Sequence, residues 1–113
     1  MVSVPTSPPV NVSAKADEKN ATLISVHWGQ VPLADRRGEI SFYTVAAIGH
    51  EGEETIIHEL NVTGFNATIS GLKPYTYYDV TVTAWTSKGE SNASEEERVQ
   101  TAQAGKEIFD NDS

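Results

Sequence analysis

The sequence contains no cysteine among its 113 residues. That absence excludes a disulfide framework, a thiol nucleophile and any zinc site built on cysteine ligands. A small domain without disulfides must be held together by its hydrophobic core, and this chain is long enough for one such core plus short tails. The sequence therefore predicts a single domain stabilised by packing.

Basic residues and long apolar runs are also scarce. Eight Lys and Arg stand against 16 Asp and Glu, which gives a formal net charge of -8. Nucleic acids and anionic membranes need a basic face, and no apolar run approaches the roughly 20 residues of a membrane helix. We expect no nucleic-acid partner and no membrane insertion by this segment. The first residues lack the features of a signal peptide, so we expect a piece of a longer secreted or receptor chain.

Motifs for catalysis and metal binding are missing as well. The chain has no Gly-x-Ser-x-Gly, no phosphate-binding glycine loop and no paired-His motif. We expect a non-enzyme with no cofactor, no metal and no catalytic residue. His50 and His58 flank a predicted hairpin rich in Glu but lack ligand spacing, which favours solvent-facing strand positions for both. His27 is likewise expected at the surface.

Every asparagine in the chain, by contrast, begins an N-glycosylation sequon, with Ser or Thr two residues on and no Pro between. Ser and Thr make up only 21 of the 113 residues. Six matches out of six would arise by chance on the order of a few times in a hundred thousand. The pattern indicates a secreted or extracellular protein with glycans over much of its surface. The predicted sites are Asn11, Asn20, Asn61, Asn66, Asn92 and Asn111.

Apolar and polar residues alternate in several short runs. The run that holds Ile24, Val26 and Trp28 and the run from Tyr78 to Ala84 both have a period of two, which is typical of half-buried strands. Turn residues separate such runs at short intervals, and seven short strands in one domain indicate an all-β sandwich. The expected strands are residues 9–14, 21–28, 40–48, 54–61, 65–70, 76–85 and 94–101.

The two ends of the chain differ from this pattern. Residues 1–8 and 103–113 are polar and rich in turn-forming residues, so we expect both to be linkers toward neighbouring domains. The domain itself is expected to comprise residues 9–102.

Several spaced residues make the chain resemble a fibronectin type III domain over about residues 5–102. Trp28 ends the second expected strand, and Ile40 to Val45 fits the third-strand pattern of Ile, two residues, Tyr, one residue, Val. The stretch from Gly71 to Tyr78 is similar to the turn into the sixth strand, which would place Tyr78 at the tyrosine corner. Lys88 to Ser91 resembles the glycine turn before the last strand.

The resemblance implies a seven-stranded, immunoglobulin-like sandwich of two antiparallel sheets, one with strands A, B and E and the other with C′, C, F and G. Its structural anchors would be Trp28, Tyr43, Leu72 and Tyr78. The expected core as a whole comprises Val10, Val12, Ile24, Val26, Trp28, Tyr43, Val45, Phe65, Ile69, Leu72, Tyr78, Val80, Val82 and Val99.

The outer side of the C′CFG sheet is the most suggestive surface. Outward aromatic residues on strands are typical interface anchors, and by parity none of the outward residues is a sequon asparagine. The alternative is that Phe42 and Trp85 only pack across neighbouring strands. The outward set also includes Ala46 and Ile48, and the expected protein-binding residues are Phe42, Thr44, Tyr77, Thr81, Thr83 and Trp85.

Two charged motifs have simpler interpretations. Integrin-binding fibronectin modules carry Arg-Gly-Asp on another loop, whereas Arg37-Gly38-Glu39 ends in Glu and lies between the second and third strands. The Arg36-Arg37 pair is expected to serve loop solubility. Glu95 to Glu97 is expected to be a solvated edge that discourages strand-to-strand aggregation.

These features favour an N-glycosylated, extracellular spacer or interaction module of a cell-surface receptor or adhesion protein. The high sequon density without cysteine is similar to the repeats of receptor-type tyrosine phosphatases. Its partners would be the adjacent domains and a protein ligand or lateral receptor contact. Two alternatives stay open, namely an accessory module of a secreted enzyme and a repeat of a matrix protein.

Overall fold

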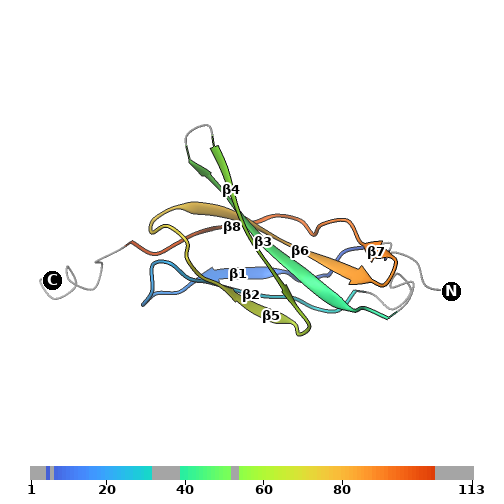
Figure 1. The fold of residues 1–113 in the computed structure, drawn as a ribbon. Coiled ribbons are helices and arrows are strands. Elements are labelled where there is room, and N and C mark those ends of the chain that lie inside the picture. Colours follow the sequence, from blue (N-terminus) through green and yellow to red (C-terminus); the bar gives the residue numbers. More distant parts are fainter. Residues whose placement is uncertain (1–4, 6, 32–38, 52–53, 104–113) are drawn as a thin grey trace, which may run out of the picture.

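The computed structural model describes residues 5, 7–31, 39–51 and 54–103, which form eight β-strands and no helix (Figure 1). No helix in this part of the chain is long and apolar enough to cross a membrane. The strands are β1 (Ser13–Ala16), β2 (Ile24–His27), β3 (Phe42–Glu51), β4 (Glu54–Val62), β5 (Asn66–Ile69), β6 (Tyr77–Thr86), β7 (Gly89–Glu90) and β8 (Glu97–Gln100).

The strands form two antiparallel sheets that lie face to face (Figure 1). The smaller sheet has the order β1-β2-β5. In the larger sheet β4, β3 and β6 lie side by side, and both β7 and β8 pair with the other edge of β6. This is the predicted all-β sandwich, with β4, β3, β6 and β8 in the positions of C′, C, F and G. The short β7 falls in the expected glycine turn.

The first strand begins later than predicted, at Ser13 rather than residue 9. Asn11 has a φ of 55°, a left-handed conformation that interrupts the extended chain. The preceding segment is still attached to the smaller sheet, because Gly29 N donates to Val10 O at 2.7 Å. Val10 itself is 39 % exposed, so its placement in the core was wrong.

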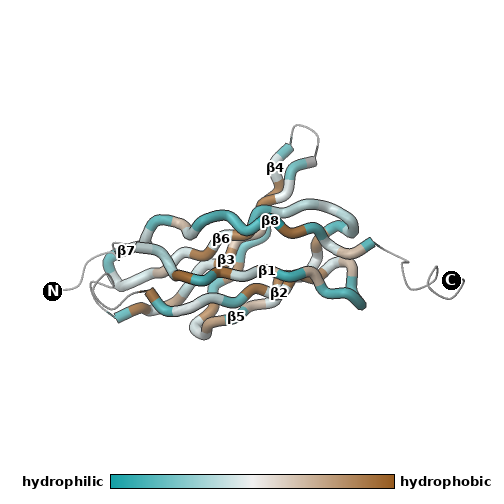
Figure 2. The backbone as a smooth tube through the Cα atoms, turned by 180° about the vertical axis from the view of Figure 1, so that it is seen from behind, coloured by the Kyte–Doolittle hydropathy of each residue, from teal (hydrophilic) through white to brown (hydrophobic). Residues whose placement is uncertain are grey.

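The core lies between the two sheets and is built from the inward residues of both. The predicted anchors Trp28, Tyr43, Leu72 and Tyr78 are all buried, and the Trp28 and Tyr43 rings meet edge to face at 5.5 Å. Phe65, expected in the core, is 41 % exposed; its ring lies 5.7 Å from that of Tyr43, at the rim. The fully buried side chains include Ile24, Val26, Val31, Val45, Val80 and Val82. Figure 2 shows apolar residues alternating with polar ones along the strands.

Tyr78 connects three parts of the sandwich. Its hydroxyl accepts a hydrogen bond from Lys73 N at 2.9 Å, which is the tyrosine corner that the family resemblance implied. Its ring lies directly on Gly49 of β3, its partner across the strands. The His58 ring of β4 meets it edge-on at 6.2 Å. A single side chain thus ties the turn before β6 to β3 and β4.

Gly49 leaves no room for a side chain beneath Tyr78, since an added Cβ would lie 2.6 Å from Tyr78 Cε1. We expect Gly49→Ala to lower the free energy of unfolding by about 1–3 kcal/mol, the usual cost of overpacking a core. Urea unfolding followed by tryptophan fluorescence measures this change. Gly64→Ala is the matched control, because an added Cβ there meets nothing within 4 Å. Equal stability losses in the two variants would contradict the proposed role of Gly49.

Candidate functional site

The outer face of the larger sheet carries all six predicted binding residues. Across β3 and β6, Phe42 pairs with Trp85, Thr44 with Thr83 and Ala46 with Thr81. Tyr77 is 56 % exposed, whereas Ala46 is buried despite its outward position. We call this surface the outer face, defined by Phe42, Thr44, Ala46, Ile48, Ile57, Glu59, Asn61, Tyr77, Asp79, Thr81, Thr83, Trp85 and Arg98.

One end of the outer face is formed by two stacked aromatic rings. The centroids of Phe42 and Trp85 are 5.3 Å apart and their planes differ by 15°. Trp85 Nε1 donates to Thr44 Oγ1 at 2.9 Å, and Thr44 Oγ1 donates in turn to Asn61 Oδ1 at 2.7 Å. The packing of Phe42 on Trp85 across strands is the arrangement that the alternative interpretation of these residues expected.

Asn61 also lies on this face, which corrects one expectation. β4 spans Glu54–Val62, close to the expected strand of residues 54–61, and places Asn61 opposite Thr44 in register. The prediction that no sequon asparagine shares the face was therefore wrong. The cause is that the expected outward residues were taken from β3 and β6 alone, whereas the register of β4 with β3 places alternate β4 residues on the same face.

The opposite end of the outer face exposes large apolar side chains. Tyr77 is 56 % exposed and Ile57 is 57 % exposed. Between them Ile48 is half-buried and pairs with Ile57 on one side and with Asp79 on the other. The guanidinium carbon of Arg98 lies 5.8 Å from the centre of the Tyr77 ring, within the range of a cation–π contact.

An ion pair between the buried Asp79 and the exposed Arg98 lies at this end of the outer face. Asp79 is 8 % exposed and accepts from Arg98 through both oxygens, from Nε at 3.0 Å and from Nη2 at 3.2 Å. His50 Nε2 lies 3.9 Å from the same carboxylate. The hydrogen bonds from Arg98 lower the pKa of Asp79 and outweigh the opposing effect of burial. The sequence signal that could have identified this site is an aspartate in the middle of a strand, where the residue type is rare.

Five of the six sequon asparagines lie in the described residues, and all five are exposed: Asn11, Asn20, Asn61, Asn66 and Asn92. Asn111 lies outside the described residues. Asn20 is held in a turn, where its Oδ1 accepts from Thr22 N at 3.0 Å and from Thr22 Oγ1 at 2.6 Å. Asn66 lies on β5 of the smaller sheet, opposite His27.

The histidines do not form a metal site in the part of the chain that the structure describes, where no group of three His, Cys, Asp or Glu side chains could hold a metal ion. His27 and His50 are exposed. His58 differs from the expectation, because it is half-buried on the inner side of β4 and packs on Tyr78. The pair Arg36-Arg37 and the first two residues of Arg37-Gly38-Glu39 lie outside the described residues.

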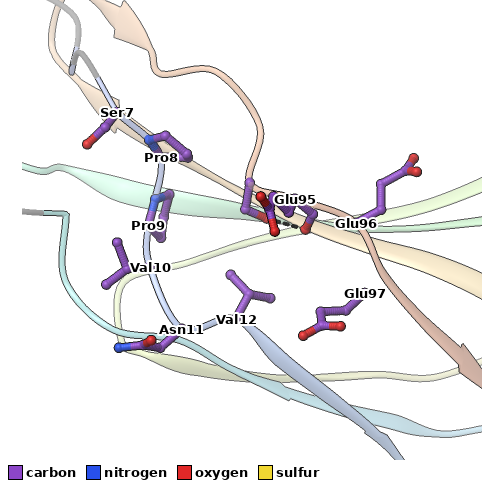
Figure 3. Close-up of a pocket in the computed structure, with 10 residues that line it drawn as sticks. Ser7, Pro8, Pro9, Val10, Asn11, Val12, Glu95, Glu96 and Glu97 are labelled. Carbon is purple, nitrogen blue, oxygen red and sulfur yellow. Dashed lines mark hydrogen bonds between the residues drawn. The ribbon is translucent and has the colours of Figure 1, made fainter.

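A shallow groove of about 590 Å³ separates the segment Ser7 to Val12 from residues 94–97 (Figure 3). It follows the line where the smaller sheet meets the larger one at their β1 and β8 edges. Glu95, Glu96 and Glu97 are all exposed beside it. Ser94 is buried, and its Oγ accepts from Val82 N at 2.9 Å. The groove offers acidic groups at an open edge, and its buried hydroxyl is already used by β6.

The fold agrees with a comparison to protein families. A family model for the fibronectin type III domain matches residues 7–100. The chain belongs to the fibronectin type III family. A domain of this family is a non-catalytic module.

Two curated relatives and one solved structure illustrate the similarity. This fibronectin type III chain is 34 % identical over 89 residues to protein sidekick of Drosophila melanogaster, covering 77 % of the chain and 4 % of that protein. It is 35 % identical over 102 residues to receptor-type tyrosine-protein phosphatase F of Danio rerio, covering 88 % and 5 %. The third fibronectin III domain of the human KIAA0343 protein has a TM-score of 0.78 at 26 % identity, covering 93 % of this chain and 89 % of that one.

The lowered pKa of Asp79 makes the stability of this fibronectin type III domain depend on pH. In the unfolded chain Asp79 titrates near its ordinary value of 3.8, so its contribution is complete above that pH and is lost as pH falls through the lower folded pKa. We expect Asp79→Asn to reduce the free energy of unfolding at pH 7, and the difference from the unsubstituted domain to shrink below pH 3.8. Urea titrations across this range measure both quantities.

The matched control for that experiment is Glu59→Gln, which removes an exposed carboxylate from the same outer face. It tests whether the loss follows from the Arg98 contact or only from the change in net charge. A stability difference for Asp79→Asn that stays constant from pH 7 to pH 2 would rule out the ion pair as its source.

Proposed function

We propose that this fibronectin type III domain is a non-catalytic, N-glycosylated spacer and interaction module in the extracellular part of a cell-surface receptor or adhesion protein. A relative that is named a receptor-type phosphatase supports the receptor context. The chain spans only 4 % and 5 % of the lengths of the two relatives above, which fits one repeat in a long array. In this proposal residues 9–102 form the domain, and residues 1–8 and 103–113 link it to its neighbours.

The direction of the chain supports the spacer role. The described chain enters at the end of the sandwich near β7 and leaves after β8 at the opposite end (Figure 1). A module with its two connections at opposite ends adds its full length to a string of domains. Adjacent domains of the parent protein are therefore its first proposed partners.

Protein binding is proposed for the outer face, and the exposed Tyr77–Ile57 end is the single observation that carries it. Tyrosine and arginine are enriched at the centres of protein interfaces. Here Tyr77 is exposed beside Arg98, whose guanidinium is fixed by two hydrogen bonds to Asp79. A partner would meet side chains that are already ordered, which lowers the entropic cost of binding.

The proposed binding is tested by Tyr77→Ser combined with Ile57→Ser. We expect the double variant to lose at least tenfold in affinity for a partner found in a panel of purified cell-surface ectodomains that includes a second copy of this domain. The control is Ser25→Ala with His27→Ala, which changes exposed residues of the smaller sheet. Biolayer interferometry measures the affinities. Unchanged binding by the Tyr77 and Ile57 variant, or a panel without any binder, argues against the interaction role. The spacer role would then be the only part of the proposal that remains.

The proposed glycosylation is tested by secreting the domain from animal cells and mapping each sequon by mass spectrometry. Exposure of all five described asparagines supports modification, because a glycan needs an asparagine that points into solvent. We expect at least four occupied sites. Zero or one occupied site would remove the argument for an extracellular location and favour the alternative of an accessory module.

A further inference from the structure

We propose that the stacked pair of Phe42 and Trp85 is the seat of the glycan carried by Asn61. The first sugar would lie on these rings and not extend freely into solvent. The inference rests on the proposed glycosylation. It adds that the glycan on Asn61 takes one orientation, in which its first sugar packs on Phe42 and Trp85. It also divides the outer face into a sugar-covered end and a bare end.

The position of Asn61 in the sheet brings it next to Phe42. Asn61 pairs with Thr44 across β4 and β3, and Phe42 is two residues from Thr44 on the same side of β3. Such diagonal neighbours lie roughly 7–8 Å apart. Trp85 follows as the direct partner of Phe42 on β6. A sugar ring attached to Asn61 is therefore within reach of the aromatic pair.

The hydrogen-bond chain across the face fixes the asparagine and remains after modification. Trp85 donates to Thr44, and Thr44 donates to Asn61 Oδ1. Glycosylation joins Nδ2 to the anomeric carbon of the first sugar. The sugar–phosphate bond of a diphosphate-linked donor breaks, its electron pair leaves with the diphosphate, and the amide loses one N–H proton. Oδ1 is unchanged, so it can still accept from Thr44 while Nδ2 carries the sugar.

The chemistry of the two rings suits a sugar better than a polar partner. The single donor of Trp85 is already used by Thr44, since the indole has only one N–H. Each half-buried ring uses one face in the stack, and its other face keeps the negative side of the π-system, which attracts the weakly positive C–H groups on the apolar side of a pyranose. An aromatic pair without a free donor gives contact area without a requirement for hydrogen bonds.

Asn66 lies on a strand as Asn61 does but has no aromatic pair beside it across the strands. Asn66 is also an exposed strand residue in a sequon. Its partner across the smaller sheet is His27, and the next pair on the same side is Ser25 with Thr68. The same glycan there would meet polar side chains. Asn66 therefore serves as an internal control for the effect of a glycan without the aromatic platform.

The test compares domains secreted from animal cells and trimmed with an endoglycosidase that leaves the first sugar. Thr63→Ala removes the Asn61 sequon but keeps the asparagine and its bond to Thr44. We expect Thr63→Ala to lower Tm by about 4 °C, the size expected for an aromatic contact in a small domain. The same change in a Phe42→Leu background should shift Tm by less than about 1 °C. Thr63→Ser retains the sequon and should behave like the unsubstituted domain.

Two further controls assign the shift to the sugar. Thr68→Ala removes the Asn66 sequon and should leave Tm within about 1 °C. Unglycosylated domains from bacteria should show no difference between Thr63→Ala and the unsubstituted chain. As a second readout, the N-acetyl methyl protons of the Asn61 sugar should shift upfield in NMR spectra, because they lie in the ring current of the pair. That shift should disappear in Phe42→Leu.

The other possible outcomes overturn either the contact between sugar and rings or the glycosylation itself. Occupied Asn61 with no Tm loss in Thr63→Ala, or an equal loss in the Phe42→Leu background, rules out the aromatic seat. Unoccupied Asn61 beside occupied Asn11, Asn20 and Asn66 also rules it out but keeps the proposed glycosylated module. No occupied site at all overturns the proposed glycosylation itself.

Discussion

The contact between the Tyr78 ring and Gly49 is the constraint on which the rest of the sandwich depends. The ring needs the bare backbone of β3 beneath it, and its hydroxyl holds the turn before β6 through Lys73. Lys73 O in turn accepts from Thr101 Oγ1 at 2.6 Å, just after β8. One buried aromatic side chain thereby sets how β3, β6 and the last strand meet at this end of the molecule.

The outer face follows from this inner arrangement. Once the inward residues of β3 and β6 are packed, the period of two places their neighbours in fixed rows on the other side. At one end a hydrogen-bond chain links Trp85, Thr44 and Asn61, and at the other Asp79 holds Arg98 beside Tyr77. The two ends have different chemistry. Ala46 lies between them, and its small side chain is buried, so it does not extend from the surface. A single sheet face can therefore carry two different occupants.

Alternation and spaced anchors were enough to predict the two sheets, the buried Trp28 and the outward direction of Tyr77. Parity says which side of its own strand a residue takes, but it does not say where a strand starts or which residues of neighbouring strands share a face. Asn11 adopts a left-handed conformation and leaves Val10 exposed. The register of β4 with β3 places Asn61 on the outer face, although its expected strand was nearly right in length. The pair of Asp79 and Arg98 joins residues that are distant in sequence, and only the register of β6 with β8 brings them together.

The opposite placement of the chain's two connections has a mechanical consequence. A pull on both ends acts along the strands, with β1 drawn one way and β8 drawn the other (Figure 1). Hydrogen bonds between antiparallel strands run perpendicular to that direction. The four residue pairs between β1 and β2 and the four between β6 and β8 would then share the load at once instead of opening one after another. A domain loaded in this way resists unfolding by shear between its strands. The strand order that places the two connections at opposite ends therefore also sets the force that the domain withstands.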